Sequence, residues 1–375
     1  MIVGVLREGG SENRVALLPE NVTALVKKHV TVLIESDAGT SSCAGNEEYV
    51  DAGAAIQTKD YIMRESDIVL KINPPEDDQI PAGKVLVAIL NPLSNTGLVK
   101  KLADAGVTAF SLDMVPRSSR AQAVDILSSM ATIAGYKAVL VAASKLPNFF
   151  PMFMSASGTI KPSKVLILGA GVAGLQALAT ARKLGAVVEV FDVRPAVKEE
   201  VMSLGGKFIE VEGSTDDVGA GGYAVEQTEE YKSRQQKLIH EHAVKSNVVI
   251  CTAQIPGKKA PLLLTRETVE EMHPGSVIID MAAGSGGNCE LTRKDETIVH
   301  KQVRIIGNSN FPSRLPADAS KMLGTNYINF LNLMITDEGR LSLDFQDDII
   351  SSTCITREHE IVNQKVLEII NLENE

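Results

Sequence analysis

The chain has 375 residues, of which 44% are hydrophobic and 22% are charged, and its formal net charge is −10 at pH 7. This length favours two domains over one, and this composition is typical of a soluble globular protein rather than a disordered chain. The excess of negative charge, with no cluster of basic residues, argues against nucleic acid as a partner.

The four cysteines are widely separated and lack the spacing of a zinc site or a disulfide framework, so we expect reduced thiols and no metal site. The first residues lead directly into a strand pattern, which predicts no secretory signal. Glycine, lysine or arginine interrupts the apolar stretches, so no membrane-spanning segment is expected. These features predict a cytoplasmic protein.

In the first third of the chain, short β-branched runs alternate with helical patterns, which predicts parallel strands joined by crossover helices. A long helix is expected over 118–145, and Pro147 and Pro151 mark a break after it. The predicted strands are 2–6, 30–35, 68–72, 85–90 and 107–112, and helical periodicity appears at 20–28 and 96–105.

The second lobe begins with a strand, a glycine turn and a helix, and further apolar runs predict a sheet of about six strands. After Pro312 and Pro316, the apolar positions of 317–335 favour a helix that packs on the first lobe. The expected strands of the second lobe are 164–168, 187–191, 206–211, 248–252, 277–280 and 303–306, with a helix at 172–184.

We therefore predict an α/β fold of two Rossmann-like lobes with parallel sheets around a cleft. The first lobe is expected to be discontinuous, with 1–145 and 316–375, and the second to comprise 146–315. An apolar pattern at 341–345 further predicts a strand that contributes to a homodimer interface.

The most specific motif is a glycine turn between a predicted strand and a predicted helix. Gly169 suits the tight turn, Gly171 lets the backbone approach a pyrophosphate, and Gly174 allows close packing of the helix on the strand. The helix N-terminus would then face the phosphates. A glycine turn needed only for packing is the alternative, but the strand, the helix and a later aspartate together favour dinucleotide binding.

Asp192 stands at the end of the next strand, where it would accept hydrogen bonds from the adenosine ribose. Its negative charge would repel a 2′-phosphate, which favours NAD(H) over NADP(H). Arg194 has a charge that suits a 2′-phosphate, but beside a retained aspartate we interpret it as a stacking residue or an ion-pair partner.

A second constellation lies at 117–128, directly after the last predicted strand of the first lobe. Arg117, Gln122, Asp125 and Ser128 fit a turn and a helix start that present polar groups to a nicotinamide carboxamide. On pattern alone, a capped and solvated helix start explains the segment equally well. The glycine-rich segment 219–224, which contains Tyr223, suits either a mobile lid or a linker.

These residues resemble the soluble NAD(H)-binding component, domain I, of proton-translocating NAD(P) transhydrogenase, and the resemblance covers nearly the whole chain. It implies that Gln254, where the family has an aliphatic residue, contacts the adenosine side. The segment 281–285 departs from the family pattern, because it lacks the acidic residue of the family's Val-Glu-Ala. The matching motifs are at 14–20, 117–128, 169–174, 191–195, 221–224, 255–258 and 286–289, together with Tyr136.

The resemblance also implies roles for individual residues. A loop that carries Tyr223 closes over the nucleotide, and Asp125 and Ser128 hold the loop at the nicotinamide end. That end is lined by Arg117, Ser118, Ser119, Arg120 and Gln122, and the rest of the nucleotide is contacted by Val172, Asp192, Val193, Arg194, Gly222, Gln235 and Gln254.

Alanine dehydrogenase is the related family and therefore the alternative enzyme. Its reaction needs a histidine as general acid/base after a leucine in its fourth strand, whereas here Leu90 is followed by Asn91, which cannot titrate. Arg14 and Lys71 remain suited to hold a carboxylate, or they form buried ion pairs.

The transhydrogenase resemblance implies that NADH on this chain passes a hydride directly to NADP+ on another subunit, in a Re/Si-specific reaction that needs no acid/base residue. Gln122 is the expected bridging amide. The resemblance further implies a homodimer that is peripheral to the membrane through separate membrane-spanning subunits, which translocate protons. A non-catalytic NAD-sensing module is the remaining alternative.

Overall fold

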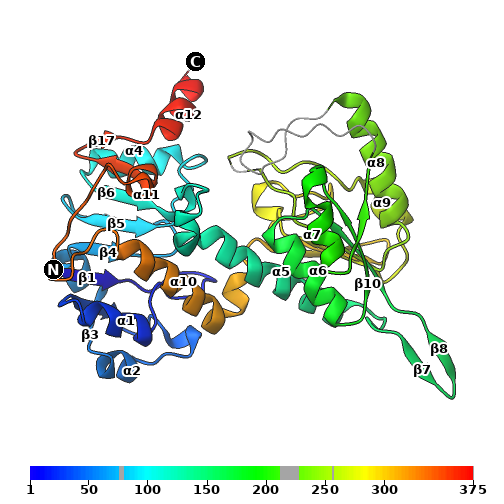
Figure 1. Ribbon diagram of the computed structural model, residues 1–375, viewed down its shortest axis with the longest axis horizontal. Helices are drawn as coiled ribbons and strands as arrows, with labels where there is room; N and C mark the ends of the chain where they lie inside the picture. Colours follow the sequence, from blue (N-terminus) through cyan, green and yellow to red (C-terminus); the bar gives the residue numbers. More distant parts are fainter. Residues whose placement is uncertain (76–79, 212–227, 256, 375) are drawn as a thin grey trace. The chain divides into compact units, whose positions relative to one another are not determined.

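The computed structural model describes residues 1–75, 80–211, 228–255 and 257–374. The chain divides into two compact units, one formed by Met1–Met130 and Pro312–Glu375 and the other by Ala131–Phe311 (Figure 1). From the sequence, these boundaries are expected at 145 and 315 instead. The first boundary lies earlier because helix α5 (Ile126–Lys145) contributes buried residues such as Ala138 and Ala142 to the core of the second unit.

The first unit is built on a sheet that, among the described residues, has eight strands in the order β17-β16-β6-β5-β4-β1-β2-β3. The first six strands along the chain are parallel, whereas β16 is antiparallel to β6 and β17 to β16. Central strands such as β4 and β5 are buried throughout, as expected for a parallel sheet covered on both faces. The strands are β1 (Ile2–Val5), β2 (Thr31–Glu35), β3 (Ala55–Gln57), β4 (Ile68–Leu70), β5 (Val85–Ala88), β6 (Thr108–Ser111), β16 (Cys354–Arg357) and β17 (Glu360–Ile361).

Helices from both segments of the first unit surround this sheet. Its short 3₁₀ turns are η1 (Thr40–Ser42), η2 (Leu112–Met114), η3 (Arg120–Val124) and η7 (Pro312–Arg314). Its helices are α1 (Pro19–Val26), α2 (Asn46–Asp51), α3 (Lys59–Glu65), α4 (Thr96–Asp104), α10 (Pro316–Leu331), α11 (Asp348–Thr353) and α12 (Gln364–Asn374).

The strand predicted at 341–345 is wrong. Leu341 forms only an isolated antiparallel bridge with Ile335. The position beside β6 is taken by β16, whose residues Cys354 and Thr356 pair with it. The local alternation of apolar residues therefore has no neighbouring strand to pair with.

The sheet of the second unit has, among the described residues, seven strands in the order β11-β10-β9-β12-β13-β15-β14. All neighbours are parallel except β14, which pairs antiparallel with β15 and is the strand that the sequence did not predict. The strand order reverses between β9 and β12, so a crevice is expected at their carboxyl ends. The strands are β9 (Lys164–Leu168), β10 (Val187–Phe191), β11 (Lys207–Ile209), β12 (Val248–Cys251), β13 (Val277–Asp280), β14 (Thr297–His300) and β15 (Val303–Ile306).

The remaining elements of the second unit cover this sheet or extend from it. A hairpin of β7 (Phe153–Ser155) and β8 (Gly158–Ile160) projects away from the sheet (Figure 1). The helices beside α5 are α6 (Val172–Lys183), α7 (Lys198–Ser203), α8 (Glu229–Ala243) and α9 (Arg266–Glu271), and the 3₁₀ turns are η4 (Pro195–Val197) and η6 (Ala283–Ser285).

Among the described residues, α5 alone is long and apolar enough to cross a membrane by length and composition. Its residues Ala134, Ala138 and Ala142 are buried in the core of the second unit, which is typical of a core helix. A Cβ added at Gly135 would lie 2.1 Å from the carbonyl oxygen of Ala173, so glycine lets α5 approach the start of α6 closely.

Candidate functional site

The glycine turn joins β9 to α6 at the point where the strand order of the second unit reverses. Gly169 has a φ of 107°, in the left-handed region that favours glycine. A Cβ at Gly174 would lie 1.9 Å from the carbonyl oxygen of Gly169, so this glycine allows the helix to pack on the turn. Gly171 differs, because an added Cβ would meet nothing within 4 Å. It is the N-cap of α6, and it leaves open the face on which a pyrophosphate would approach.

Asp192 follows β10 and lies beside this turn. Its carboxylate accepts hydrogen bonds from the N–H of Ala170 at 2.7 Å and the N–H of Arg194 at 2.9 Å. The Arg194 guanidinium also pairs with it, with Nε–Oδ1 and Nη2–Oδ2 distances of 2.9 and 2.8 Å. The aspartate is thus held at the turn, and Arg194 is its ion-pair partner.

A buried hydrogen-bond network, which the sequence analysis did not identify, ties together the loops after β12 and β13. Asp280 is fully buried, and burial raises its pKa, against the effect of the Thr292 hydroxyl and of three backbone N–H groups. Its Oδ2 accepts hydrogen bonds from the backbone N–H groups of Asn288 and Cys289 at 2.8 and 3.0 Å. Asn288 in turn bonds both the N–H and the carbonyl of Ala253.

This network reaches the glycine turn through Thr252, whose hydroxyl donates to the carbonyl oxygen of Gly169 at 3.0 Å. A polar residue at the end of a buried strand, such as Asp280 in β13, is the signal from which sequence reasoning could have found it. The network fixes the backbone at the carboxyl ends of β9, β12 and β13 relative to one another.

The other nucleotide-side candidates of the second unit lie around the same edge or on α8. The Gln254 carboxamide donates to the carbonyl oxygen of Met281 at 3.0 Å, so it is held by the loop after β13. Val172 is 43% exposed at the start of α6, Val193 is partly buried after β10, and Gln235 is partly buried on α8. Gly222 and Tyr223 lie outside the described residues.

In the first unit, the segment 117–128 folds as a 3₁₀ turn followed by a helix rather than as one helix from 118. Turn η3 ends at Val124, and Asp125 has a ψ of 87°, which interrupts the helical path before α5 begins. The Asp125 carboxylate accepts hydrogen bonds from the N–H and the hydroxyl of Ser128 at 2.9 and 2.6 Å. Asp125 and Ser128 thus form the start of α5.

The side chains presented by η3 have different surroundings. Gln122 is exposed, and its carboxamide forms no hydrogen bond within the part of the chain that the structure describes. The Ser118 hydroxyl is buried without a partner among those residues, whereas Ser119 and Arg117 are exposed. Arg120 forms a two-point ion pair with Asp347. Gln122 is therefore the side chain of this turn that is best placed to bond a ligand amide.

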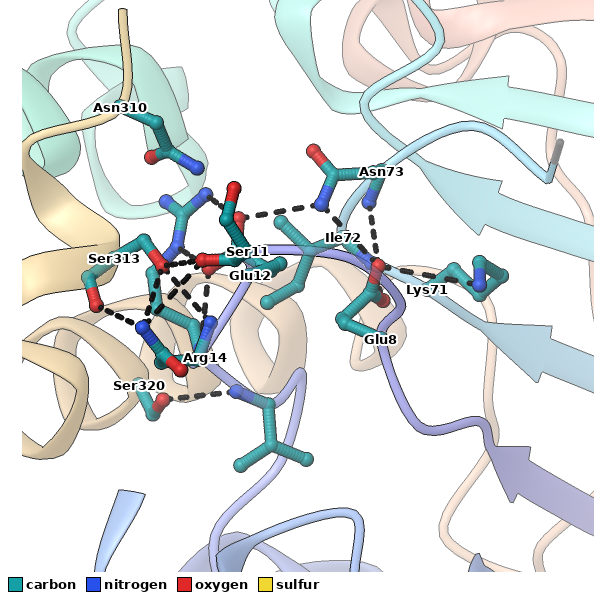
Figure 2. Close-up of polar contacts among 12 residues, drawn as sticks. Glu8, Ser11, Glu12, Arg14, Lys71, Ile72, Asn73, Asn310, Ser313 and Ser320 are labelled. Atoms are coloured by element: carbon teal, nitrogen blue, oxygen red, sulfur yellow. Dashed lines mark hydrogen bonds and ion pairs between the residues drawn. The ribbon is translucent and has the colours of Figure 1, made fainter. Parts of the chain in front are cut away.

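A separate charged cluster surrounds Arg14 and Lys71 in the first unit (Figure 2). The Arg14 guanidinium donates to both carboxylate oxygens of Glu12, at 2.7 and 2.6 Å. The exposed fractions of these two side chains are only 5% and 3%. Lys71 Nζ lies 3.9 Å from Glu8 Oε2, and burial raises the pKa of Glu8 although Lys71 lowers it. The two cations are matched by two carboxylates inside the protein, which is the ion-pair interpretation of these residues.

Asn91, which follows Leu90 after β5, does not supply the histidine expected for the alanine dehydrogenase alternative. Its backbone lies in the left-handed region, with a φ of 50°. The Leu90 N–H donates to the Ser111 hydroxyl at 2.9 Å, and this hydroxyl donates to the carboxyl of Asp113, whose pKa is raised by burial. Asp113 is thus connected to the loop that follows β5 through the Ser111 hydroxyl.

Comparison with known proteins places these features in one family. The model of the alanine dehydrogenase/PNT N-terminal domain matches residues 4–134, and that of the C-terminal domain matches residues 138–364. The chain belongs to the alanine dehydrogenase/PNT family. Within this family, it is 42% identical to "NAD(P) transhydrogenase subunit alpha" of Haemophilus influenzae, over 96% of this chain and 71% of that protein. It is 29% identical to "Alanine dehydrogenase 2" of Staphylococcus aureus, over 100% of this chain and 97% of that protein.

Among solved structures, this chain is likewise similar to both a transhydrogenase and an alanine dehydrogenase. A transhydrogenase from Sinorhizobium meliloti matches with a TM-score of 0.88 and 39% identity, and the match covers 96% of this chain and 100% of the other. An L-alanine dehydrogenase matches with a TM-score of 0.83 and 25% identity, over 99% of both chains. The resemblance to transhydrogenase and the α/β fold with Rossmann-like sheets are thereby confirmed.

Proposed function

We propose that this chain is the NAD(H)-binding subunit of a proton-translocating NAD(P) transhydrogenase and that its reaction is a Re/Si-specific hydride transfer to NADP+ on a partner subunit. The observation that carries the proposal is the exposed Gln122 carboxamide on a turn with no acid/base residue, in a chain that also has a complete dinucleotide turn. Asn91 supports it, because oxidation of an amino acid needs a proton carrier at that position.

The residues of the second unit fit a dinucleotide. Gly171 leaves room for a pyrophosphate at the N-terminus of α6, where backbone N–H groups and the helix dipole favour negative charge. Asp192 is held at the end of β10, where a ribose hydroxyl would donate to it. Arg194 already donates hydrogen bonds to that carboxylate. A bound ribose would therefore either donate to Asp192 together with Arg194 or displace the Arg194 side chain.

NADH, when bound, supplies the hydride, and the protein contributes position rather than proton transfer. Gln122 has one amide donor group and one carbonyl acceptor, which is the complement of a nicotinamide carboxamide. Asp125 and Ser128 fix the helix start that follows its turn, and the exposed Arg117 adds positive charge before the turn. Tyr223 and Gly222 complete the proposed nucleotide contacts.

We further propose that the subunit is a homodimer in the cytoplasm that reaches the membrane through partner subunits carrying NADP(H) and the proton channel. The apolar hairpin of the second unit supports a contact between two copies, because exposed apolar residues gather there. Phe149 and Phe153 pack in a tilted arrangement with ring centroids 4.3 Å apart, and Met154 is 73% exposed. Met154→Lys is expected to shift the mass measured by light scattering from dimer to monomer. A dimer that persists would show that this hairpin is not the interface.

The proposed function is tested by reconstitution. The purified chain is mixed with NADH, a purified NADP(H)-binding transhydrogenase subunit and NADP+, and hydride transfer is followed optically in parallel with an assay of L-alanine and NAD+. We expect transfer only when both proteins are present. NADH production from L-alanine by this chain alone would instead support the alanine dehydrogenase function.

An NAD-sensing module is the second candidate, favoured only by the binding features of the second unit. A sensor would bind NADH tightly and catalyse neither reaction in the same assays. It would also tolerate Gln122→Asn with no change in its response, because binding at Gly171 and Asp192 would be untouched.

A further inference from the structure

Turn η3, which presents Gln122, is fastened at its beginning by residues that come more than 200 positions later in the chain. The Arg120 guanidinium donates to both carboxylate oxygens of Asp347, each at 2.7 Å, and also contacts Asp348. Asp347 is itself the N-cap of α11, since its side chain accepts from the N–H groups of Ile349 and Ile350. The two parallel hydrogen bonds fix the orientation of the Arg120 guanidinium as well as its distance from the Asp347 carboxylate.

The end of the same turn is fastened by two asparagines of α10. The side-chain amides of Asn326 and Asn329 both donate to the carbonyl oxygen of Ala123, each at 2.9 Å. This carbonyl lies at the end of a 3₁₀ turn and before the first residue of α5, where helical partners are lacking. Two donors on one carbonyl restrain its position more tightly than one.

Helix α10 is a rigid base for these two amides. Tyr327, Phe330 and Leu331 on this helix are fully buried in the first unit. Asn326 is itself only 5% exposed, and Asn329 lies one turn later on the same face and is partly buried. Their side chains therefore project from a packed helix toward one carbonyl group.

Gln122 immediately precedes Ala123, and its carboxamide has no hydrogen-bond partner within the described part of the chain. A fixed backbone with a free side-chain amide is the arrangement that holds a ligand in a reactive geometry at low entropic cost. Resting on the proposed function of Gln122, we propose that Asn326 and Asn329 are positioning residues for hydride transfer, which hold the Gln122 turn through the Ala123 carbonyl.

The proposal is tested with Asn329→Asp, which keeps the size of the side chain but removes the amide donor, because a carboxylate only accepts. Thr325→Ala is the matched control on the same helix, since the Thr325 hydroxyl bonds only within α10. At saturating partner subunit, we expect Asn329→Asp to lower turnover about 10-fold, because small displacements of a positioning group are costly. The Kd for NADH should be unchanged, and Thr325→Ala should match the wild type.

A double-mutant cycle separates positioning from a general structural role. If the asparagines act through Gln122, Asn329→Asp should have no further effect on turnover in a Gln122→Ala background. A loss of turnover in that background as large as in the wild type would overturn the proposal. So would wild-type turnover of Asn329→Asp.

Stability and the wild-type reaction give the remaining controls. Asn326→Ala is expected to destabilise the fold more than Asn329→Asp does, because Asn326 is buried. If the Tm of Asn326→Ala falls, the turnover of Asn329→Asp decides whether the asparagines position Gln122. Should the wild-type chain support no hydride transfer with the partner subunit, the proposed function itself would fail. Transfer by the wild type with an unaffected Asn329→Asp would remove only the role of the asparagines.

Discussion

The proposed function involves the glycine turn of the second unit and the η3 turn of the first unit, and these two turns are built in different ways. The glycine turn is completed by Asp192, 23 residues after Gly169, and its main contacts are local in sequence. The η3 turn depends on Asn326, Asn329 and Asp347, which are remote in sequence. The first can thus be read from a motif, whereas the second needs a tertiary structure.

The two turns also differ in the hydrogen bonding of their polar side chains. In the glycine turn, the essential groups are backbone atoms and a carboxylate that already has four hydrogen bonds from Ala170 and Arg194. In η3, the backbone is restrained and the side chain of Gln122 is left without a partner among the described residues. We infer that the first turn serves binding and the second serves alignment of the reacting ring. The following variants test this comparison.

The largest effects are expected at the glycine turn. Gly174→Ala would place a Cβ 1.9 Å from the carbonyl oxygen of Gly169, so it should lower the Tm by several degrees and abolish NADH binding.

Gly171→Ala has open space for its Cβ and should keep the wild-type Tm, but it should weaken NADH binding by about 10- to 100-fold, because it blocks phosphate contacts. An unchanged Kd for NADH in Gly171→Ala would show that Gly171 has no special role in binding.

A smaller loss, and of a different kind, is expected at Gln122. Gln122→Asn keeps the amide but retracts it by one methylene, so turnover with the partner subunit should fall by about 10- to 100-fold. NADH affinity, measured by fluorescence titration, should remain as in the wild type, since the phosphate and ribose contacts are untouched. A matched loss of affinity and turnover would indicate that Gln122 contributes binding instead of alignment.

Asp192→Asn should change the choice of nucleotide. Loss of the charged acceptor is expected to lower NADH affinity about 10-fold. Loss of the negative charge also frees Arg194 from its ion pair and removes repulsion of a 2′-phosphate, so NADPH affinity should rise. An unchanged ratio of the two Kd values would mean that the Asp192–Arg194 pair does not determine specificity.

The smallest effect is expected from the Arg120–Asp347 ion pair. Arg120 lowers the pKa of Asp347 from 3.8 to about 2, so the pair contributes stability above pH 3.8, and this contribution is lost as the pH falls through about 2. Asp347→Asn keeps an N-cap side chain for α11 but removes the charge. Its Tm should lie slightly below that of the wild type near pH 6, and the two Tm values should converge toward pH 2. A constant difference across this range would exclude the ion pair as its cause.

Much of the second unit could be predicted from the sequence because its signals are local. The runs of Val, Leu and Ile, the spacing of Gly169, Gly171 and Gly174, and Asp192 at the end of a strand fall within one βαβ unit. The short antiparallel strand β14 was missed, since its exposed and half-buried residues lack the apolar run of a central strand.

The remaining elements could not be predicted because their partners are remote or their signals are shared with other structures. A helix over 118–145 was expected from continuous periodicity, yet the Asp125 backbone breaks it and the Asp125 side chain caps the portion that follows. Strand β16 follows helix α11 without an intervening residue and β17 has only two residues, so neither gave a separate signal, and the sequence instead favoured 341–345. Asp280 belongs to no motif, and the motif 286–289 that contains Asn288 gave no role for its side chain, although a polar residue that ends a buried strand indicates a buried network.

The central claim is direct hydride transfer from NADH on this chain to NADP+ on a partner, and isotope tracing tests it most directly. The chain and an NADP(H)-binding subunit are incubated in ordinary water with NADP+ and with NADH that carries deuterium on the transferred face of C4, and the NADPH is analysed by mass spectrometry. Direct transfer predicts that the deuterium appears in NADPH, and only when this chain is present. NADPH that contains solvent hydrogen in place of the label, or labelled NADPH formed without this chain, would contradict the account.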